Sequence, residues 1–145
     1  VSLLTDVRVG HRGVKMGQPE INSGIPSVLG PMLMYHRIGL SHATEMTLTG
    51  RMFDAEEAAR IGLLHHLVET PSEVMKKSHE IATLLAAKPP VAMRLTKKWL
   101  RELTQADFEH AFANGAAIQA EAYACGEPQD EMRKFFEERA KKKKK

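Results

Sequence analysis

The sequence has little of several residue types, and each shortage removes a class of protein from consideration. Cys125 is the only cysteine, so the chain forms no internal disulfide, which fits a reducing compartment. Only 6% of the residues are aromatic and no RNA-binding module is visible, so nucleic acid is an unexpected partner. No apolar run approaches the ~18 residues that span a bilayer. We therefore expect a cytoplasmic protein with no membrane partner.

Patterns for metals and nucleotides are missing as well. His65 and His66 are adjacent, so on an extended segment their side chains face opposite sides. Neither has a cysteine or an acid at the spacing of metal ligands. No glycine-rich phosphate loop occurs in the chain. We therefore expect neither a metal site nor a bound cofactor.

What is present is typical of one globular domain. The chain has 145 residues, of which 43% are hydrophobic and 27% are charged, enough for a sizeable core. The formal net charge is +3, and the lysine run at 141–145 supplies more than all of it. We expect residues 141–145 to form a disordered, solvated tail, the alternative being a contact with phosphates.

The first part of the chain has the pattern of short strands. Leu4, Val7 and Val9 predict a buried strand that ends at Gly10, and a second extended piece is expected around residues 14–16. A domain that begins inside an apolar strand, with no polar residues before it, is expected to be truncated. One edge of that strand is expected to need a partner.

After Pro26 the pattern is helical, with glycines, prolines and capping residues at the boundaries. Thr70, Pro71 and Glu73 combine a cap, a first-turn proline and a capping-box acid, which is a strong helix start. The other expected helices begin at Pro31 and end at Gly39, begin at Ser41 and end at Gly50, and run from Ala55 to Ile61 behind the Asp54–Glu57 pair. Residues 63–68 are expected to be extended.

The last third is expected to be all helix. Pro89–Pro90 interrupts the chain, and the residues that then recur every four positions predict a stripe facing the core. These residues are Val91, Leu95, Trp99 and Leu103. Thr104 with Asp107 predicts the cap of another helix, and Gly126 predicts the last break.

Glu20 is the candidate catalytic residue. It lies in the run from Gly17 to Pro26 (GQPEINSGIP), where Pro19 fixes the preceding backbone and the glycines allow tight turns on both sides. A glutamate held there against an apolar ligand site would be desolvated, which favours the proton-carrying form needed for acid/base work. The alternative, which spacing alone favours, is an exposed or helix-capping glutamate.

A second run, Thr49 to Ala58 (TGRMFDAEEA), follows the first at a fixed interval. Together the two runs resemble the second half of the enoyl-CoA hydratase/isomerase (crotonase) family. The resemblance implies an α/β fold, the C-terminal part of a crotonase ββα spiral with short strands first and mostly α-helix afterwards. It implies a core part over residues 1–88 and a helical trimerisation region over residues 89–140.

The resemblance also implies an activity. Family members act on acyl-CoA thioesters by enolate chemistry, and enoyl-CoA hydratase, which adds water to a 2-enoyl-CoA, is the first expectation. In hydratases the matching glutamate is one of two acid/base carboxylates, which assigns that role to Glu20. Double-bond isomerisation is the first alternative, because one carboxylate is enough to shuttle a proton. A non-catalytic oligomerisation module is the second. The CoA thioester is the substrate, and no cofactor is implied.

One segment departs from the family pattern. Where relatives carry a glycine-rich turn, this chain has Pro26-Ser27-Val28-Leu29-Gly30-Pro31. In hydratases a backbone N–H of that turn holds the reacting water, and Ser27 stands nearest that place. We expect Pro26, Ser27 and Gly30 to contact substrate. Met32 and Leu33 are expected either to line the acyl site or to belong to the core.

The family features that precede this region are absent from the 145 residues. In relatives the two N–H groups of the oxyanion hole and the second glutamate lie upstream, so the chain alone is expected to be inactive and to need an N-terminal companion segment. Lys97, Phe135 and Arg139 match basic or terminal-helix positions that meet CoA in relatives, the alternatives being a solvated face and ordinary packing. A homotrimer or hexamer is implied.

Overall fold

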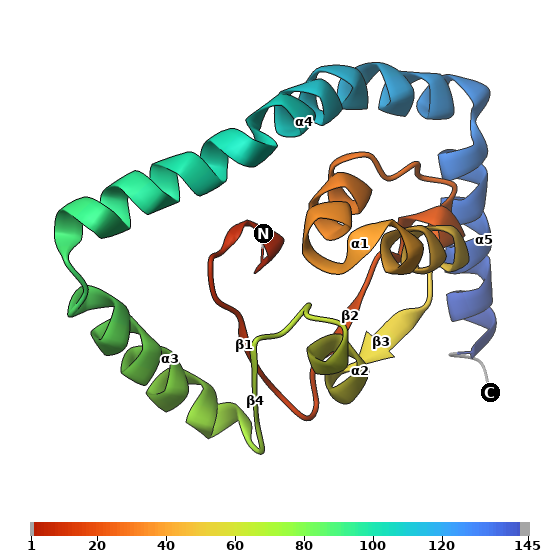
Figure 1. Ribbon diagram of the computed structural model, residues 1–145. Helices are drawn as coiled ribbons and strands as arrows, with labels where there is room; N and C mark the ends of the chain where they lie inside the picture. The colour runs from red at the N-terminus through yellow and green to blue at the C-terminus, as the bar shows by residue number, and fades with distance from the viewer. Residues whose placement is uncertain (1, 143–145) are drawn as a thin grey trace.

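Four short strands form two small sheets in the computed structural model, which describes residues 2–142 (Figure 1). Strand β1 (Val9–His11) pairs in parallel with β4 (His66–Val68), and β2 (Lys15–Gly17) pairs antiparallel with β3 (Met52–Asp54). The short strands expected near the N-terminus and around 63–68 are therefore confirmed, with shorter spans than the sequence indicated.

The strand predicted from Leu4 is wrong at its start. Residues Ser2–Leu4 form a 3-10 turn, η1, and the Leu4 side chain is exposed. Both the N–H and the hydroxyl of Thr5 donate to the carbonyl of Ser2, at 3.1 and 2.7 Å, and these bonds close the turn before a strand can begin. Strand β1 starts only at Val9 and continues one residue past Gly10. Val1 lies outside the described residues.

Helix α1 (Leu29–Thr49) joins the two helices expected before and after Gly39. Gly39 has φ 76° and ψ 165°, a backbone conformation that breaks the helical path and that essentially only glycine adopts. Gly50 ends the helix in the left-handed conformation, with its N–H donating to the carbonyl of Met46 at 3.2 Å. The predicted boundaries at Gly39 and Gly50 are confirmed.

The capping residues predicted for the next two helices are in place. Asp54 accepts a hydrogen bond from the N–H of Glu57 at 2.8 Å and starts α2 (Ala55–Arg60). The Glu57 carboxylate instead accepts from Arg51, and that hydrogen bond lowers the pKa of Glu57. Helix α3 (Pro71–Ala86) begins with the expected capping box, in which Glu73 accepts from the N–H of Thr70 at 2.8 Å.

Helix α4 (Pro90–Cys125) is one continuous helix of 36 residues, so the cap predicted at Thr104 is wrong. The Thr104 hydroxyl donates to the carbonyl of Arg101 at 3.3 Å, a bond inside the helix that replaces the capping role. The break predicted at Gly126 is confirmed: this residue has φ 84° and separates α4 from α5 (Glu127–Lys142). Of the predicted tail, 141 and 142 belong to α5, and 143–145 lie outside the described residues.

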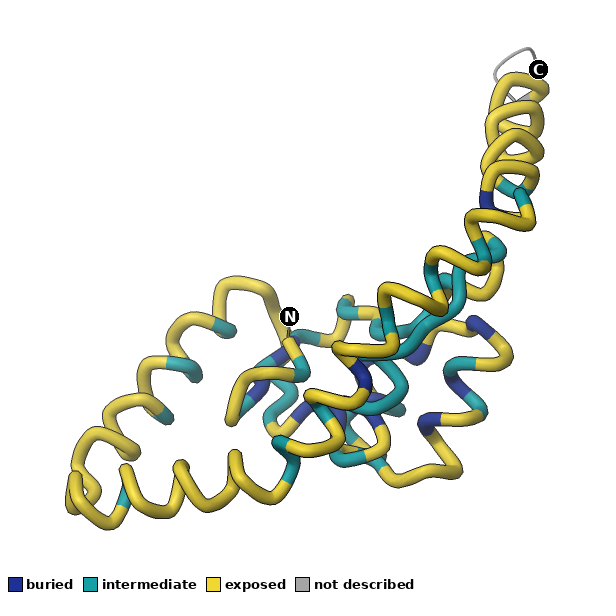
Figure 2. The backbone as a smooth tube through the Cα atoms, turned by 90° about the horizontal axis from the view of Figure 1, so that it is seen from above, coloured by how far each residue is buried: buried dark blue, intermediate teal, exposed yellow. Residues whose placement is uncertain are grey.

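The core is small and lies among α1, β3 and the turn that follows α2. Its largest fully buried side chains are Phe53, Met34, Met46 and Leu63. Figure 2 shows the buried residues gathered in the centre, while the long helices around them are mostly exposed. Burying these side chains removes apolar surface from water, at about 25 cal/mol per Å², and holds the strands and α1 together.

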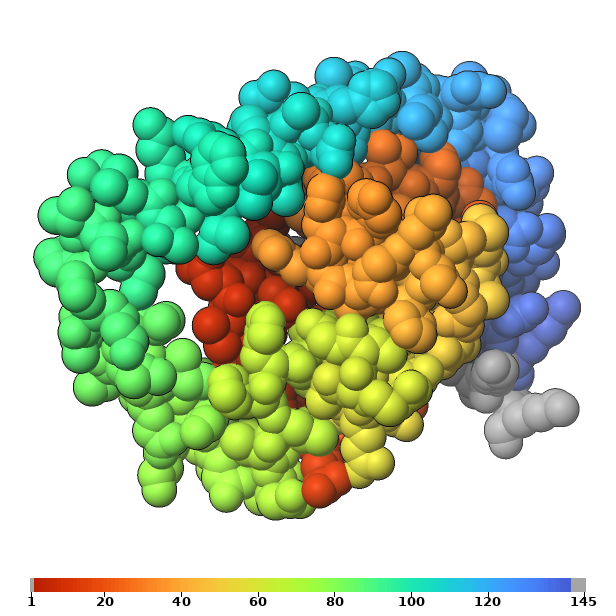
Figure 3. Space-filling model, in the orientation of Figure 1, coloured from red at the N-terminus to blue at the C-terminus, as the bar shows by residue number. Residues whose placement is uncertain are grey.

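The stripe predicted to face the core is wrong for this chain. The four residues of the stripe, from Val91 to Leu103, are 51–61% exposed along the first half of α4. This half-helix and α3 form an arm around the N-terminal segment, and Figure 3 shows a hollow between them. The period of four correctly places the apolar residues on one side of the helix, but no other described element packs over most of that side.

A buried arginine ties the N-terminal segment to the turn before β4. Arg8 is 5% exposed and donates to the carbonyls of Thr5, Gly62 and Leu63, at 3.0, 3.2 and 2.6 Å. Its backbone N–H donates to Nδ1 of His65 at 3.1 Å. Burial, together with the positive charge of Arg8, lowers the pKa of His65, so this imidazole is neutral where it accepts the bond.

Candidate functional site

Glu20 lies on a 3-10 turn, η2 (Pro19–Ser23), directly after β2. Pro19 occupies the first position of the turn, and Gly24 closes it in the left-handed conformation with φ 66°. The carbonyl of Glu20 accepts the N–H of Ile25 at 3.1 Å. The backbone of the candidate residue is therefore fixed at both ends, as the spacing of glycine and proline predicts.

The Glu20 side chain has an unusual feature. Its Oε2 atom is buried and accepts no hydrogen bond from any residue within 2–142. A buried carboxylate oxygen without a donor is costly, and most buried polar atoms in proteins are paired. The arrangement suits an oxygen whose partner is supplied by a bound molecule, such as a water or an acidic carbon of a substrate.

Two distant elements hold η2 in place. Asn22 donates from Nδ2 to the carbonyl of Gly50, at the end of α1, at 3.0 Å. On the other side, the backbone of Gly24 lies against Glu127 of α5, so closely that a Cβ at Gly24 would stand 2.9 Å from Glu127 Cγ. The position of Glu20 thus depends on contacts with both α1 and α5.

The loop from Ile25 to Val28, which leads into α1, is held by two glutamines. Gln18 donates from Nε2 to the Ser27 hydroxyl at 3.3 Å, and Gln119 of α4 donates from Nε2 to the carbonyl of Pro26 at 2.6 Å. A Cβ on Gly30 would stand 2.1 Å from Gln18 Nε2, so Gly30 leaves the space that Gln18 occupies. Of the predicted substrate-binding residues, Ser27 and Gly30 thus lie against Gln18, and Pro26 is held by Gln119.

Sequence reasoning missed both glutamines. Gln18 stands inside the quoted GQPEINSGIP run, so a signal for it was present, although its task is to hold Ser27. Gln119 carries no local signal, because its partner Pro26 lies 93 positions away in the sequence. Only the packing of α4 on α1 reveals it.

The three residues predicted to meet CoA lie in different parts of the chain. Lys97 is on the first half of α4, and its Nζ contacts Asp6 Oδ2 at 2.7 Å. Phe135 and Arg139 are on α5, beyond the other end of α4 (Figure 1). The Phe135 ring is exposed and meets Phe136 edge-on, with ring centroids 5.8 Å apart. A role for these residues with CoA stays a prediction.

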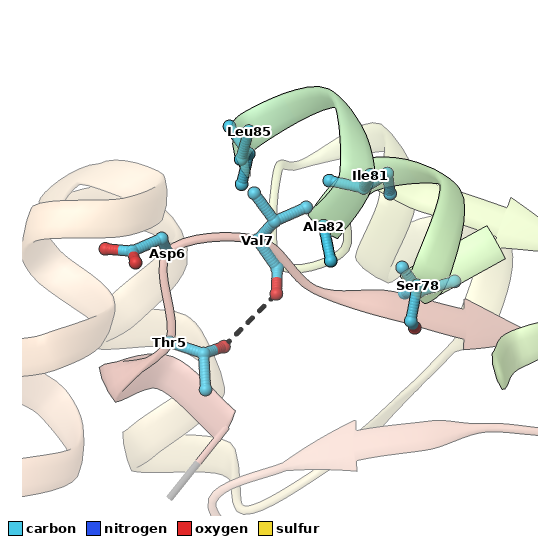
Figure 4. Close-up of a pocket in the computed structure, with 8 residues that line it drawn as sticks. Thr5, Asp6, Val7, Ser78, Ile81, Ala82 and Leu85 are labelled. Carbon is cyan, nitrogen blue, oxygen red and sulfur yellow. Dashed lines mark hydrogen bonds between the residues drawn. The ribbon is translucent and has the colours of Figure 1, made fainter. Parts of the chain in front are cut away.

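Two hollows open beside the core. One, of about 260 Å³, lies between the segment that precedes β1 and the inner face of α3 (Figure 4). Val7 from the first side meets Ile81, Ala82 and Leu85 from the second, and Asp6 is the only charged residue of the lining. The other, of about 390 Å³, lies between α1 and the second half of α4, beside the loop that carries Ser27.

Among residues 2–142, no cluster of His, Cys, Asp or Glu is placed to hold a metal ion. None of the described helices is both long and apolar enough to cross a membrane.

Comparison with known proteins identifies the family. The profile of the family described as enoyl-CoA hydratase/isomerase matches residues 1–144. A short-chain-enoyl-CoA hydratase of Clostridium acetobutylicum is 31% identical over 140 residues, covering 96% of this chain and 53% of that protein. A crotonyl-CoA hydratase of Syntrophomonas wolfei is 29% identical, covering 96% of this chain and 54% of that protein.

A solved structure shows the same fold. The crystal structure of an enoyl-CoA hydratase/isomerase from Pseudoalteromonas atlantica superposes with a TM-score of 0.86 at 24% identity, covering 94% of this chain and 55% of that chain. The chain thus spans about half the length of the relatives that it matches. The predicted crotonase-type α/β fold is confirmed, and the chain belongs to the enoyl-CoA hydratase/isomerase family.

Proposed function

We propose that the protein to which these residues belong is an enoyl-CoA hydratase, which adds water to the double bond of a 2-enoyl-CoA, and that Glu20 is an acid/base residue. The observation that carries the proposal is the buried, unpartnered Oε2 of Glu20 on a segment fixed at both ends. The names of the relatives, short-chain-enoyl-CoA hydratase and crotonyl-CoA hydratase, support the choice of reaction.

Hydration breaks the π bond of the 2-enoyl thioester and one O–H bond of water, and it forms a C–O bond at the β carbon and a C–H bond at the α carbon. A water oxygen bonds to the β carbon and gives up one proton, while the α carbon, negative in the enolate, takes a proton. A carboxylate near both carbons accepts the first proton or donates the second, and a positioned acid or base of this kind contributes about 10²–10⁴-fold. The reaction therefore needs no cofactor besides the CoA thioester itself.

The loop around Ser27 is proposed to hold the reacting water and the nearby part of the substrate. Pro26, Ser27 and Gly30 are the proposed contacts, and Gln18 fixes the hydroxyl of Ser27. The oxyanion hole and a second carboxylate are proposed to come from an N-terminal companion segment, as the family resemblance implies. Such donors supply a large share of catalysis, because they are already oriented toward the negative oxygen of the enolate.

The test is Glu20→Gln in the whole protein, assayed with crotonyl-CoA by loss of the absorbance of the enoyl thioester. We expect kcat to fall at least ~100-fold with the oligomeric size unchanged, because the amide transfers no proton. Glu121→Gln, on the exposed part of α4, is the matched control and is expected to leave kcat unchanged. Retention of kcat within a factor of about three in the Glu20 variant would remove this residue from the mechanism.

Isomerisation is the second candidate, because one carboxylate, here Glu20, is enough to move a proton between two carbons. A 3-enoyl-CoA and a 2-enoyl-CoA of equal chain length distinguish the two reactions. Faster conversion of the 3-enoyl ester to its 2-enoyl isomer, without hydration, would favour the isomerase.

We also propose a homotrimer or hexamer in the cytoplasm, with Lys97, Phe135 and Arg139 near CoA. The exposed apolar side chains of α3, α4 and α5 support the assembly, since surfaces of this kind mark contacts between proteins. They equally support a non-catalytic assembly module. In that case Glu20→Gln would change the sedimentation behaviour of the protein and no CoA-dependent activity would be lost.

A further inference from the structure

The groove of about 390 Å³ between α1 and α4 has a defined direction. At one end, Gln119 of α4 donates to the carbonyl of Pro26, at 2.6 Å. At the other end, His36 Nε2 of α1 contacts Asp107 Oδ2 of α4, at 2.8 Å. From the Pro26 end to the His36 end, residue numbers rise along α1 and fall along α4, so the two helices run antiparallel. The position of each lining residue along the groove therefore follows from its residue number.

The lining changes in character along this direction. Beside the Ser27 loop it is apolar, with Val28, Met32 and Ile118. Toward the far end polar side chains join the lining, first Asn114 and then His110, with the buried Ala111 between them in the sequence. Tyr35 and Asp107 complete the far end. Val28 and Tyr35 are seven positions apart, which corresponds to ~10 Å at the helical rise of 1.5 Å per residue.

The far end offers both a donor and acceptors. Asn114 Nδ2 donates to the carbonyl of His110 at 2.7 Å and lies 3.5 Å from His110 Nδ1. These contacts leave Asn114 Oδ1 and His110 Nε2 without a hydrogen bond to any residue of the described chain. Asp107 contacts His36 through Oδ2, and its Oδ1 forms no hydrogen bond within the described chain. A hydroxyl, which donates and accepts at once, complements this set.

We propose that the groove receives the part of the acyl chain beyond the reacting carbons, and that it selects chains with a neutral hydrogen-bonding group, such as a hydroxyl, toward their far end. The proposal rests on the proposed acyl-CoA function and gives the class of its substrate. Its basis is continuity: the apolar end of the groove begins at Val28, next to Ser27, and Ile118 adjoins Gln119, which holds the same loop.

Two other kinds of chain fit less well. A plain alkyl chain of the same length would place its end against Asn114, His110 and Asp107, and would displace water from polar groups without replacing their hydrogen bonds. A chain that ends in a carboxylate would meet the negative charge of Asp107, and neither lysine nor arginine is among the described lining residues. Short chains such as crotonyl do not extend to the polar end and are indifferent to it.

The experiment uses the whole protein and four substrates: crotonyl-CoA, 2-octenoyl-CoA, 8-hydroxy-2-octenoyl-CoA and the CoA monoester of 2-octenedioic acid. We expect the hydroxylated ester to exceed the plain C8 ester about tenfold in kcat/KM, the worth of one net hydrogen bond, and the carboxylated ester to be the poorest. Asn114→Leu, which keeps the branching at Cγ but removes the amide, is expected to bring the ratio of the hydroxylated to the plain C8 ester to about one. Glu121→Leu, outside the groove on the same helix, is the matched control and is expected to preserve the ratio.

The outcomes separate the two proposals. Suppose that crotonyl-CoA is hydrated, but kcat/KM is equal for the hydroxylated and plain C8 esters in both wild type and Asn114→Leu. This result overturns the groove proposal and leaves the hydratase proposal in place. If crotonyl-CoA is not hydrated, the hydratase proposal fails, and binding of octanoyl-CoA against 8-hydroxyoctanoyl-CoA by calorimetry then decides the groove. Equal dissociation constants, or no binding of either ester, overturn it, and tighter binding of the hydroxylated ester that Asn114→Leu abolishes supports it.

Discussion

The contact between Gly50 and η2 gives the sharpest prediction about how Glu20 is held. A Cβ at Gly50 would lie 2.6 Å from Nδ2 and 2.9 Å from Cγ of Asn22, and 2.7 Å from Cγ2 of Ile21. Gly50 also has φ 61°, where a side chain costs about 1–2 kcal/mol. Overpacking of this kind adds about 1–3 kcal/mol. We therefore expect Gly50→Ala to lower the free energy of unfolding by roughly 2–5 kcal/mol.

Gly126→Ala is the matched control. Gly126 has φ 84° and caps α4 in the same left-handed conformation, but a Cβ there meets no atom within 4 Å. Both variants carry the same backbone strain and the same change in the entropy of the unfolded chain, so their difference isolates the collision with η2. We expect this difference to be about 1–3 kcal/mol, measured by urea denaturation followed by far-UV circular dichroism.

A double variant checks the cause. Asn22→Ala removes two of the three atoms that the new methyl group would meet, and we expect Gly50→Ala to cost about 1 kcal/mol less in that background. The reasoning would be refuted if Gly50→Ala and Gly126→Ala destabilised the protein equally, because η2 would then not be packed on the end of α1. In that case the fixed position of Glu20 would need another explanation.

Three further changes test the core, the pH dependence and the completeness of the site. Phe53→Ala, at a side chain that is 0% exposed, is expected to cost about 3–5 kcal/mol in urea denaturation, whereas Phe136→Ala on the surface should cost under about 0.5 kcal/mol, and equal losses would contradict the assigned core. The pKa of His65 is lowered in the fold, so the unfolded chain binds a proton first as the pH falls, and stability should decline below the unfolded value of about 6.5. His65→Gln, which keeps an acceptor for the Arg8 N–H, should flatten that decline, and an unchanged pH profile would argue against the assignment. The purified 145-residue chain is expected not to hydrate crotonyl-CoA on its own, and sustained turnover would show that these residues contain sufficient catalytic groups.

Local patterns predicted the parts of the fold whose physical cause is local. Gly50 and Gly126 were predicted as helix ends because only glycine adopts the left-handed conformation without strain, and both hold it. Thr104 was misread because a capping residue and a threonine bonded inside a helix look alike in sequence. The GQPEINSGIP run indicated Glu20. The hydrogen bond from Gln119 to the carbonyl of Pro26 depends on how α4 packs against α1, and no local pattern encodes that packing.

The two halves of α4 differ in what fixes them. The second half packs on α1 and is pinned by Gln119 to Pro26 and by Asp107 to His36, next to the proposed acyl groove. The first half carries the exposed apolar stripe. An ion pair joins its Lys97 to Asp6 of the N-terminal segment, but both side chains are exposed and such a pair contributes little in water. Exposed apolar stripes of helical period mark surfaces that other proteins cover, so this half of α4 is where the proposed assembly would bury apolar surface. The site and its groove are therefore built on the half of the helix that this chain holds by itself, while the half that it leaves uncovered suits assembly.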